Sequence, residues 1–176
     1  MEVAGRVVLI TGASSGVGAA LATQLADMGA RVVVNYSRSA EAAEAVVDQI
    51  TGAGGQALAV QADVSEEADC KRLVATTVEH FGQLDVLVNN AGTTTFVPHD
   101  QLDALTEDIW LRTLRVNLIG AFIMSREAAP HIEAAGGGEI VMTSSIASMT
   151  ANGSSIAYCA SKAGMNSLTR TRQDTG

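Results

Sequence analysis

The chain has 176 residues, of which 47% are hydrophobic, and it carries a formal net charge of −8 at pH 7. This composition excludes a disordered chain, and because there is no basic tract we expect no nucleic-acid partner. No apolar run reaches the ~18 residues that a membrane helix needs, and the N-terminus lacks the pattern of a signal peptide, so we expect a cytoplasmic protein that does not bind a membrane.

Short β-branched segments alternate with longer alanine-rich segments along the chain. The expected strands are residues 6–11, 31–36, 56–63, 84–91 and 139–145. The expected helices are residues 16–28, 40–51, 66–80, 106–128 and 157–172. Short apolar strands of this kind are typical of a parallel sheet buried on both faces. The alternation predicts an α/β fold: a Rossmann-type, doubly wound parallel sheet with right-handed crossovers, in a single domain over residues 1–176.

The segment TGASSGVG follows the first expected strand and opens the first expected helix. In this context Gly12 would form a sharp turn, Gly16 would admit a diphosphate, and Gly18 would let the helix pack on the strand. The alternative interpretation is a tight loop whose glycines serve packing alone. No Lys-Ser or Lys-Thr pair follows, so the turn is not the P-loop of a nucleotide-hydrolysing enzyme.

The segment SSIAYCASKAG places Tyr158 four residues before Lys162. At this spacing both side chains lie on one face of a helix. An ammonium group near a tyrosine favours the phenolate, which suits the tyrosine to proton transfer. Ser145 follows the fifth expected strand, at the edge of the sheet where ligands bind. By themselves, these residues could also be an idle surface pair and a hydroxyl that caps a turn.

Five features, in this order, resemble the short-chain dehydrogenase/reductase family, in particular its 3-oxoacyl-carrier-protein reductase-like and glucose-dehydrogenase-like members. They are TGASSGVG, NNAG at 89–92, Asn117 in VNLIG, Ser145, and Tyr158-x-x-x-Lys162. The resemblance implies that Tyr158 donates a proton to the substrate in reduction and accepts one in oxidation, with Lys162 as its activator. It also implies that Ser145 hydrogen bonds to the substrate oxygen and that Asn117 holds a water of a proton relay.

The same resemblance implies a set of cofactor-binding residues. Asp63 and Val64 would contact the adenine, and Asn90, Ala91 and Gly92 would line the wall beside the nicotinamide ribose. The whole implied set is Gly12, Ser14, Ser15, Gly16, Val17, Gly18, Ser37, Arg38, Asp63, Val64, Asn90, Ala91, Gly92, Tyr158 and Lys162. The cofactor would therefore lie across the carboxyl ends of the strands.

The end of the second expected strand bears on the choice of cofactor. NAD enzymes usually present a carboxylate there to the ribose 2′-hydroxyl, whereas this chain has Asn35, Tyr36, Ser37 and Arg38. Arg38 offers a planar donor fork and Ser37 a hydroxyl, both suited to a phosphate. We therefore expect NADP(H), with NAD(H) as the alternative. Two points weaken this expectation: Ser15 stands where NADP-binding family members often carry a basic residue, and Arg38 could be a solvated charge.

Together these features predict an oxidoreductase that transfers a hydride between NADP(H) and a carbonyl or secondary alcohol of a small molecule. Two alternatives stay open: a non-catalytic protein that binds a nicotinamide cofactor, and an inactive truncated product of such an enzyme. Family members continue with further strands, so we expect the last strands of the sheet to be missing and the chain alone to have little activity. We also expect aggregation through the fifth strand unless a partner covers it.

The chain is also expected to form an oligomer and to bind no metal. Family members commonly associate through the two long helices expected at 106–128 and 157–172, so we expect a homodimer or homotetramer. Their apolar residues can serve either the core or a partner; they include Leu114, Leu118, Phe122, Met165 and Leu168. The three histidines lack ligand-like spacing, so we expect no metal site, and the two cysteines form no disulfide framework.

Overall fold

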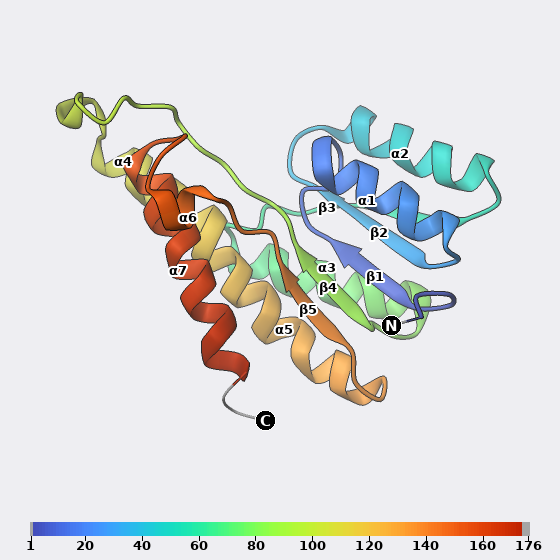
Figure 1. Cartoon of the computed structure of the whole chain (residues 1–176). Helices are drawn as coiled ribbons and strands as arrows, with labels where there is room; N and C mark the ends of the chain where they lie inside the picture. Colours follow the sequence, from blue (N-terminus) through green and yellow to red (C-terminus); the bar gives the residue numbers. More distant parts are fainter. Residues whose placement is uncertain (1, 174–176) are drawn as a thin grey trace.

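The computed structural model describes residues 2–173 and contains a sheet of five parallel strands (Figure 1). The strands are β1 (Val7–Ile10), β2 (Arg31–Tyr36), β3 (Gln56–Gln61), β4 (Val86–Asn89) and β5 (Glu139–Met142). Their order in the sheet is β3-β2-β1-β4-β5, and each neighbouring pair is parallel. The prediction of a doubly wound parallel α/β sheet is thereby confirmed.

Helices cover both faces of this sheet (Figure 1). They are α1 (Gly16–Asp27), α2 (Ala40–Gly52), α3 (Glu67–Phe81), α4 (Glu107–Leu114), α5 (Ala121–Ala134), α6 (Ala147–Thr150) and α7 (Ile156–Gln173). Successive side chains of a strand point to opposite faces. Val7 and Leu9 therefore pack in one apolar cluster with residues of α3 and α5, whereas Val8 and Ile10 pack in a second cluster with residues of α1 and α2. Burial on both faces explains why β1 is apolar throughout.

The order in which successive strands are added to the sheet reverses at β1. From β1 the chain places β2 and then β3 on one side, and it returns to place β4 and β5 on the other side. The carboxyl ends of β1 and β4 therefore lie next to each other, and the Thr11 N–H donates to the Val88 carbonyl oxygen over 3.0 Å. Open α/β sheets bind ligands in the crevice at such a switch point.

The helix expected over residues 106–128 is present, but it is not α-helical throughout. α4 passes into a π-helical segment, Arg115–Gly120, which continues directly into α5. Asn117 lies in this segment, and its side chain hydrogen bonds to the backbone of Thr93. A π-helical turn often marks a functional site, and here a tertiary contact with the loop after β4 accompanies the wider turn. The regular spacing of apolar residues gave no sign of this interruption.

α5 also continues further than expected, to Ala134, with Pro130 inside it. Pro130 lies on the exposed side, whereas Ile132, beyond it, is only 6% exposed and belongs to the core. Burial of the apolar face therefore extends the helix past a residue that normally ends one. Among the helices of residues 2–173, none is long and apolar enough to cross a membrane.

Four strands end earlier than expected. β1 ends at Ile10, β3 at Gln61, β4 at Asn89 and β5 at Met142. Asp63, the NNAG segment after Asn89, and Ser145 consequently lie in the loops that follow the strands. These loops form the carboxyl edge of the sheet, where side chains can turn toward a ligand without the alternation that a strand imposes.

Candidate active site

In the turn between β1 and α1, one glycine faces open space and another lies in close contact with neighbouring residues. Gly16 has a φ of 57°, and no neighbouring atom lies within 4 Å of the position that its Cβ would take. A Cβ on Gly18 would lie 2.6 Å from Asn90 Nδ2 and 2.6 Å from the Gly12 carbonyl oxygen. Gly18 thus permits α1 to start close to the turn, while Gly16 leaves the backbone accessible from outside.

A cavity of about 350 Å³, which we call the glycine-turn cavity, borders this turn. Gly12, Ser14 and Ser15 line it, and Ser15 is the N-cap residue of α1. The Ser15 side chain makes no capping hydrogen bond, and the first N–H groups of a helix have no intrahelical acceptor. Together with the helix dipole, these N–H groups suit an anion such as a diphosphate.

The glycine-turn cavity also reaches the carboxyl ends of β2 and β3. Ser37, Arg38, Asp63 and Val64 line it, and the Ser37 hydroxyl donates to the Asp63 carboxylate over 3.4 Å. Burial by itself would raise the pKa of Asp63, but hydrogen bonds from Ser65 and Ser37 and the charge of Arg38 hold this pKa below its ordinary value. The structure thus brings together the residues predicted to contact the adenosine end of the cofactor, and their roles stay a prediction.

Arg112 is a residue of this cavity that the sequence analysis missed. It comes from α4, and Val116 of the π-helical segment lies beside it in the cavity wall. Among the described residues that line the cavity, Arg112 and Arg38 supply two positive charges against the single carboxylate of Asp63. This balance is opposite to the net charge of −8 of the whole chain. An arginine on an exposed helix face has no distinguishing pattern, so no sequence signal pointed to Arg112.

The NNAG segment connects the glycine turn to the rest of the site. Asn90 Nδ2 donates to the carbonyl oxygens of Thr11 and Gly12, each over 3.0 Å. The Thr11 hydroxyl in turn accepts the N–H groups of Asn90 and Ala91, each over 3.0 Å. The Asn90 carboxamide is therefore held by the turn. Asn90, Ala91 and Gly92 all line the glycine-turn cavity, as expected for residues beside a cofactor.

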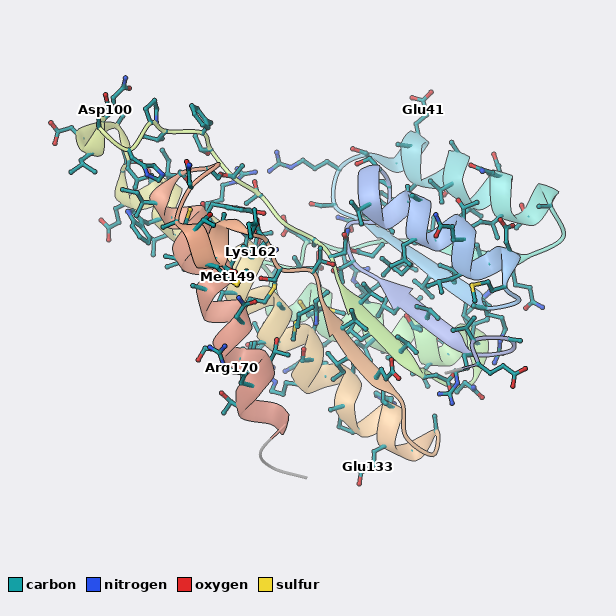
Figure 2. The ribbon with its side chains drawn as sticks, in the orientation of Figure 1. Glu41, Asp100, Glu133, Met149, Lys162 and Arg170 are labelled. Carbon is teal, nitrogen blue, oxygen red and sulfur yellow. The ribbon has the colours of Figure 1, made fainter. Side chains whose placement is uncertain are left out.

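A second cavity, of about 450 Å³, shares Asn90 and Gly92 with the first. We call it the tyrosine cavity because Tyr158 lines it, together with Ser145 and Lys162. Lys162 Nζ lies 5.8 Å from the centre of the Tyr158 ring. Figure 2 shows Lys162 on α7 near the ends of β4 and β5, whereas Asp100 lies at the tip of the loop that precedes α4. Three residues predicted to be catalytic therefore meet in one cavity next to the glycine turn.

Lys162 is almost fully buried, at 3% exposure. Its Nζ donates to the Thr143 carbonyl oxygen over 2.6 Å, just beyond the end of β5. Burial lowers the pKa of Lys162 below its ordinary value. A Cβ on Gly92 would lie 3.7 Å from Nζ, so the glycine leaves free space beside the amine. The Thr143 carbonyl thus holds the lysine amine in the cavity that Tyr158 also lines.

Ser144 and Ser145 both line the tyrosine cavity. Strand alternation does not separate these two serines, because β5 ends at Met142 and neither serine belongs to a strand. The Ser145 hydroxyl accepts the Ala147 N–H over 3.2 Å, which leaves its own proton free to be donated. Among the described residues, the buried Ser144 hydroxyl has no hydrogen-bond partner. The choice of Ser145 as the substrate contact stays a prediction.

Asn117 is fully buried and joins two segments of the site. Its Oδ1 accepts the Thr93 N–H over 2.7 Å, and its Nδ2 donates to the Thr93 carbonyl oxygen and to the Ser161 hydroxyl over 2.9 and 3.0 Å. A Cβ on Gly92 would lie 3.6 Å from this Oδ1 and 3.7 Å from Lys162 Nζ. The Gly92 position is therefore next to both groups, and the water expected to join them stays a prediction.

Tyr158 lies in the first turn of α7, and the loop after β4 holds the start of this helix. The Thr94 and Ser154 hydroxyls are 2.8 Å apart, and His99 Nε2 lies 2.7 Å from the Ser154 carbonyl oxygen. The Tyr158 N–H donates to the Ser155 hydroxyl over 3.4 Å. These contacts fix the position from which Tyr158 enters its cavity. The sequence analysis missed them because they join residues about 55 to 60 positions apart.

Metal ligation has no candidate in the part of the chain that the structure describes: no three residues among the histidines, cysteines, aspartates and glutamates lie together in a suitable group. Cys70 and Cys159 are buried and not joined in a disulfide. Burial raises the pKa of Cys70 to about 12, so this residue is a protonated thiol.

The family model described as short chain dehydrogenase matches residues 6–175. A protein named as ketoacyl reductase 2 of the granaticin polyketide synthase of Streptomyces violaceoruber is 48% identical over 96% of this chain and 66% of its own length. Versicolorin reductase 1 of Aspergillus parasiticus is 47% identical over 80% of this chain and 52% of its own length. The chain thus matches about half to two thirds of the length of these curated relatives.

A crystal structure of a short chain dehydrogenase from Burkholderia cenocepacia, solved in complex with NADP, superposes with a TM-score of 0.87. The two are 38% identical, and the match covers 98% of this chain and 69% of the other. Both the sequence match and the superposition include the glycine turn and the tyrosine cavity. The chain therefore belongs to the short-chain dehydrogenase family.

Proposed function

We propose that this chain carries the cofactor site and the catalytic residues of an oxidoreductase that transfers a hydride between NADP(H) and a carbonyl or secondary alcohol. The main support is the arrangement of the two cavities, because Ser145, Tyr158 and Lys162 line one that shares Asn90 and Gly92 with the other. A dinucleotide in the glycine-turn cavity would extend toward Tyr158. The activity is a proposal because the chain spans at most two thirds of the curated relatives compared above.

The residues of the glycine-turn cavity fit a nicotinamide dinucleotide. The uncapped start of α1 and the open face of Gly16 suit its diphosphate. We propose NADP(H) in preference to NAD(H), because β2 ends without a free carboxylate and Arg38 and Arg112 bring two guanidinium groups to the cavity. The structural neighbour from Burkholderia cenocepacia was solved with NADP, which agrees with this preference.

In the reduction, the Tyr158 hydroxyl donates its proton to the substrate oxygen while the Ser145 hydroxyl hydrogen bonds to the same oxygen. A bound nicotinamide would supply the hydride in this direction and accept it in the reverse. Lys162, when protonated, favours the phenolate that the tyrosine becomes. Protons would then return to Tyr158 along a relay that runs past Lys162 and a water at Gly92, held by Asn117.

For the substrate, we propose a ketone on a polyketide-derived or other bulky carbon skeleton. Two relatives are named as a ketoacyl reductase of a polyketide synthase and as a versicolorin reductase. The tyrosine cavity combines hydroxyl groups of Thr94 and Ser154 with the apolar side chain of Ile146, which is 65% exposed. Such a wall can contact an extended skeleton that carries both apolar and hydroxyl groups.

The proposal is tested by comparing Tyr158→Phe with the unchanged chain. We expect kcat for ketone reduction to fall by about 10²- to 10⁴-fold, as is typical for loss of a general acid, while the Kd for NADPH stays the same. Tyr36→Phe, at the chain's other tyrosine, is the matched control and should retain kcat at saturating NADPH. A Tyr158→Phe variant with a rate near that of the unchanged chain would remove Tyr158 from its role.

A substrate panel tests whether the chain is active at all. A chain that binds NADPH but reduces none of a panel of β-ketoacyl thioesters, sugars and cyclic ketones would contradict the proposed activity, as expected for either a non-catalytic cofactor-binding protein or an inactive truncated product. Tighter binding of NADH than of NADPH would contradict the proposed cofactor preference.

A further inference from the structure

Asn35, near the end of β2, lines the glycine-turn cavity and is only 1% exposed. Its Oδ1 accepts the Gly12 N–H over 3.1 Å, and its Nδ2 donates to the carbonyl oxygens of Val60 and Ala62 over 3.2 and 3.1 Å. We propose that Asn35 is a positioning residue that holds the glycine turn in the conformation that binds the diphosphate of the cofactor. This inference rests on the proposed function, because it assumes that a dinucleotide binds at the turn.

The Asn35 side chain hydrogen bonds to the chain just beyond the point where β1 stops pairing with β2. The pairing of β1 with β2 ends at Ile10 and Val34, whereas the pairing of β2 with β3 continues to Tyr36 and Gln61. At Gly12 the chain has already turned, and the Gly12 N–H is bonded by the Asn35 side chain instead of by the strand ladder. The carboxamide of Asn35 takes over and joins the turn to both β2 and β3.

The backbone of Asn35 supports the same turn. Its carbonyl oxygen accepts the Ala13 N–H over 2.8 Å, next to the Gly12 N–H that its side chain accepts. Both N–H groups at the entry of the turn are therefore directed into the protein. The N–H groups that follow, at the start of α1, remain for an anion outside. One residue thus determines which side of the turn faces the ligand.

The hydrogen bonds also determine which way the carboxamide points. Nδ2 faces three carbonyl oxygens, those of Tyr36, Val60 and Ala62, and Oδ1 faces an N–H. An amide is the side chain that supplies donors and an acceptor in this arrangement at this size. A carboxylate in its place would oppose the three carbonyl oxygens with negative charge, and it would also bring that charge close to the diphosphate.

The test measures dinucleotide affinity, which requires no turnover and no known substrate. We expect Asn35→Asp to weaken the binding of NADP⁺ and of NAD⁺ by the same factor, about tenfold or more, because both contain the diphosphate. The affinity for adenosine 2′-monophosphate, which lacks the diphosphate, should change much less. We also expect the NADP⁺ affinity of Asn35→Asp to recover partly as the pH falls, because a protonated carboxyl can again donate a hydrogen bond.

The matched control is Asn166→Asp. The Nδ2 of Asn166 donates to the Ser148 hydroxyl over 2.7 Å, and Asn166 lines neither cavity. This variant should keep its dinucleotide affinity. If Asn35→Asp does not fold, Asn35→Ala replaces it, with circular dichroism as the check on folding.

The outcomes distinguish this inference from the proposed function. If the unchanged chain binds neither dinucleotide, the proposed function fails and the inference fails with it. If the unchanged chain binds NADP⁺ and a folded Asn35 variant binds it equally well, only the inference is overturned. An equal loss of affinity for adenosine 2′-monophosphate, or in the Asn166 control, would indicate general loosening of the fold and would also overturn it.

Discussion

The proposed role of Lys162 conflicts with its surroundings, because it would place a charge in a buried position. Its Nζ bonds to the Thr143 carbonyl oxygen over 2.6 Å and contacts the Met165 sulfur at 3.9 Å. Burial favours its neutral form, which lowers the pKa of Lys162. The proposed mechanism needs the charged form near Tyr158. A site that holds a charge in a poorly solvated position is a common feature of functional residues.

This conflict predicts a pH dependence of stability. Between the lowered pKa of folded Lys162 and its ordinary value, the unfolded chain binds a proton that the folded chain has released. The free energy of unfolding contributed by Lys162 therefore rises with pH through this range. We expect the stability of the unchanged chain to increase relative to Lys162→Met as the pH rises there, measured by urea unfolding without cofactor.

The reference for this measurement is Lys71→Met, which removes the positive charge of an exposed lysine instead. A stability difference between Lys162→Met and the unchanged chain that is the same at every pH would contradict the prediction.

At the level of elements, the site depends on how closely α1, the glycine turn and the loop after β4 approach each other. Gly18 lets the first turn of α1 lie beside Asn90. The Asn90 side chain in turn donates to the carbonyl oxygens of Thr11 and Gly12. The π-helical segment between α4 and α5 supplies Asn117, which bonds to Thr93 and to Ser161 on α7. Each contact joins elements that are distant in sequence, so the cavity geometry follows from the packing of the elements.

We expect Gly18→Ala to lower the free energy of unfolding by about 1–3 kcal/mol, because its Cβ would overlap Asn90 Nδ2 and the Gly12 carbonyl oxygen. NADPH affinity should fall as well, since α1 must move away from the turn. The control is Gly52→Ala at the end of α2, where no neighbouring atom lies within 4 Å of the added Cβ. This change should be neutral or stabilise by up to about 1 kcal/mol, because alanine favours a helix. Equal denaturation midpoints for the two variants would contradict the prediction.

At the level of the whole molecule, two of the surfaces that expose apolar side chains bear on assembly. One is β5, which has a sheet neighbour on one side only within residues 2–173 and whose Val141 is 43% exposed. The other consists of Leu111, Ile119 and Phe122 on α4, the π-helical segment and α5, each close to half exposed. Met165, which we considered for a partner contact, is fully buried and belongs to the core. The homodimer or homotetramer stays a prediction.

We expect the 176-residue chain to self-associate through β5, because an apolar edge strand can pair with another copy. Val141→Lys should shift the population toward the monomer in light scattering at micromolar concentration. Phe122→Lys provides the comparison, because it tests the helical surface instead. If Phe122→Lys alone produced the monomer, association would proceed through the helices, and the prediction for β5 would be wrong.

Local patterns determined much of the protein. The short apolar runs predicted all five strands, since burial on both faces of a sheet selects such residues, and the glycine turn followed from its place between a strand and a helix. The spacing of Tyr158 and Lys162 predicted that they share a helix face. These features depend on neighbours within a few positions, which the sequence displays directly. That residues 1–176 form a single domain stays a prediction.

The tertiary structure decided the parts of the site that depend on distant contacts. Arg112 lines the glycine-turn cavity although α4 itself packs against α7, and the carboxamides of Asn35 and Asn117 find partners 23 to 44 positions away. The same holds for the π-helical segment that interrupts the expected long helix. Hydrogen bonds of this kind depend on the final distance between elements. A periodic pattern of apolar residues predicts which face of an element is buried, but it does not predict which polar atoms meet there.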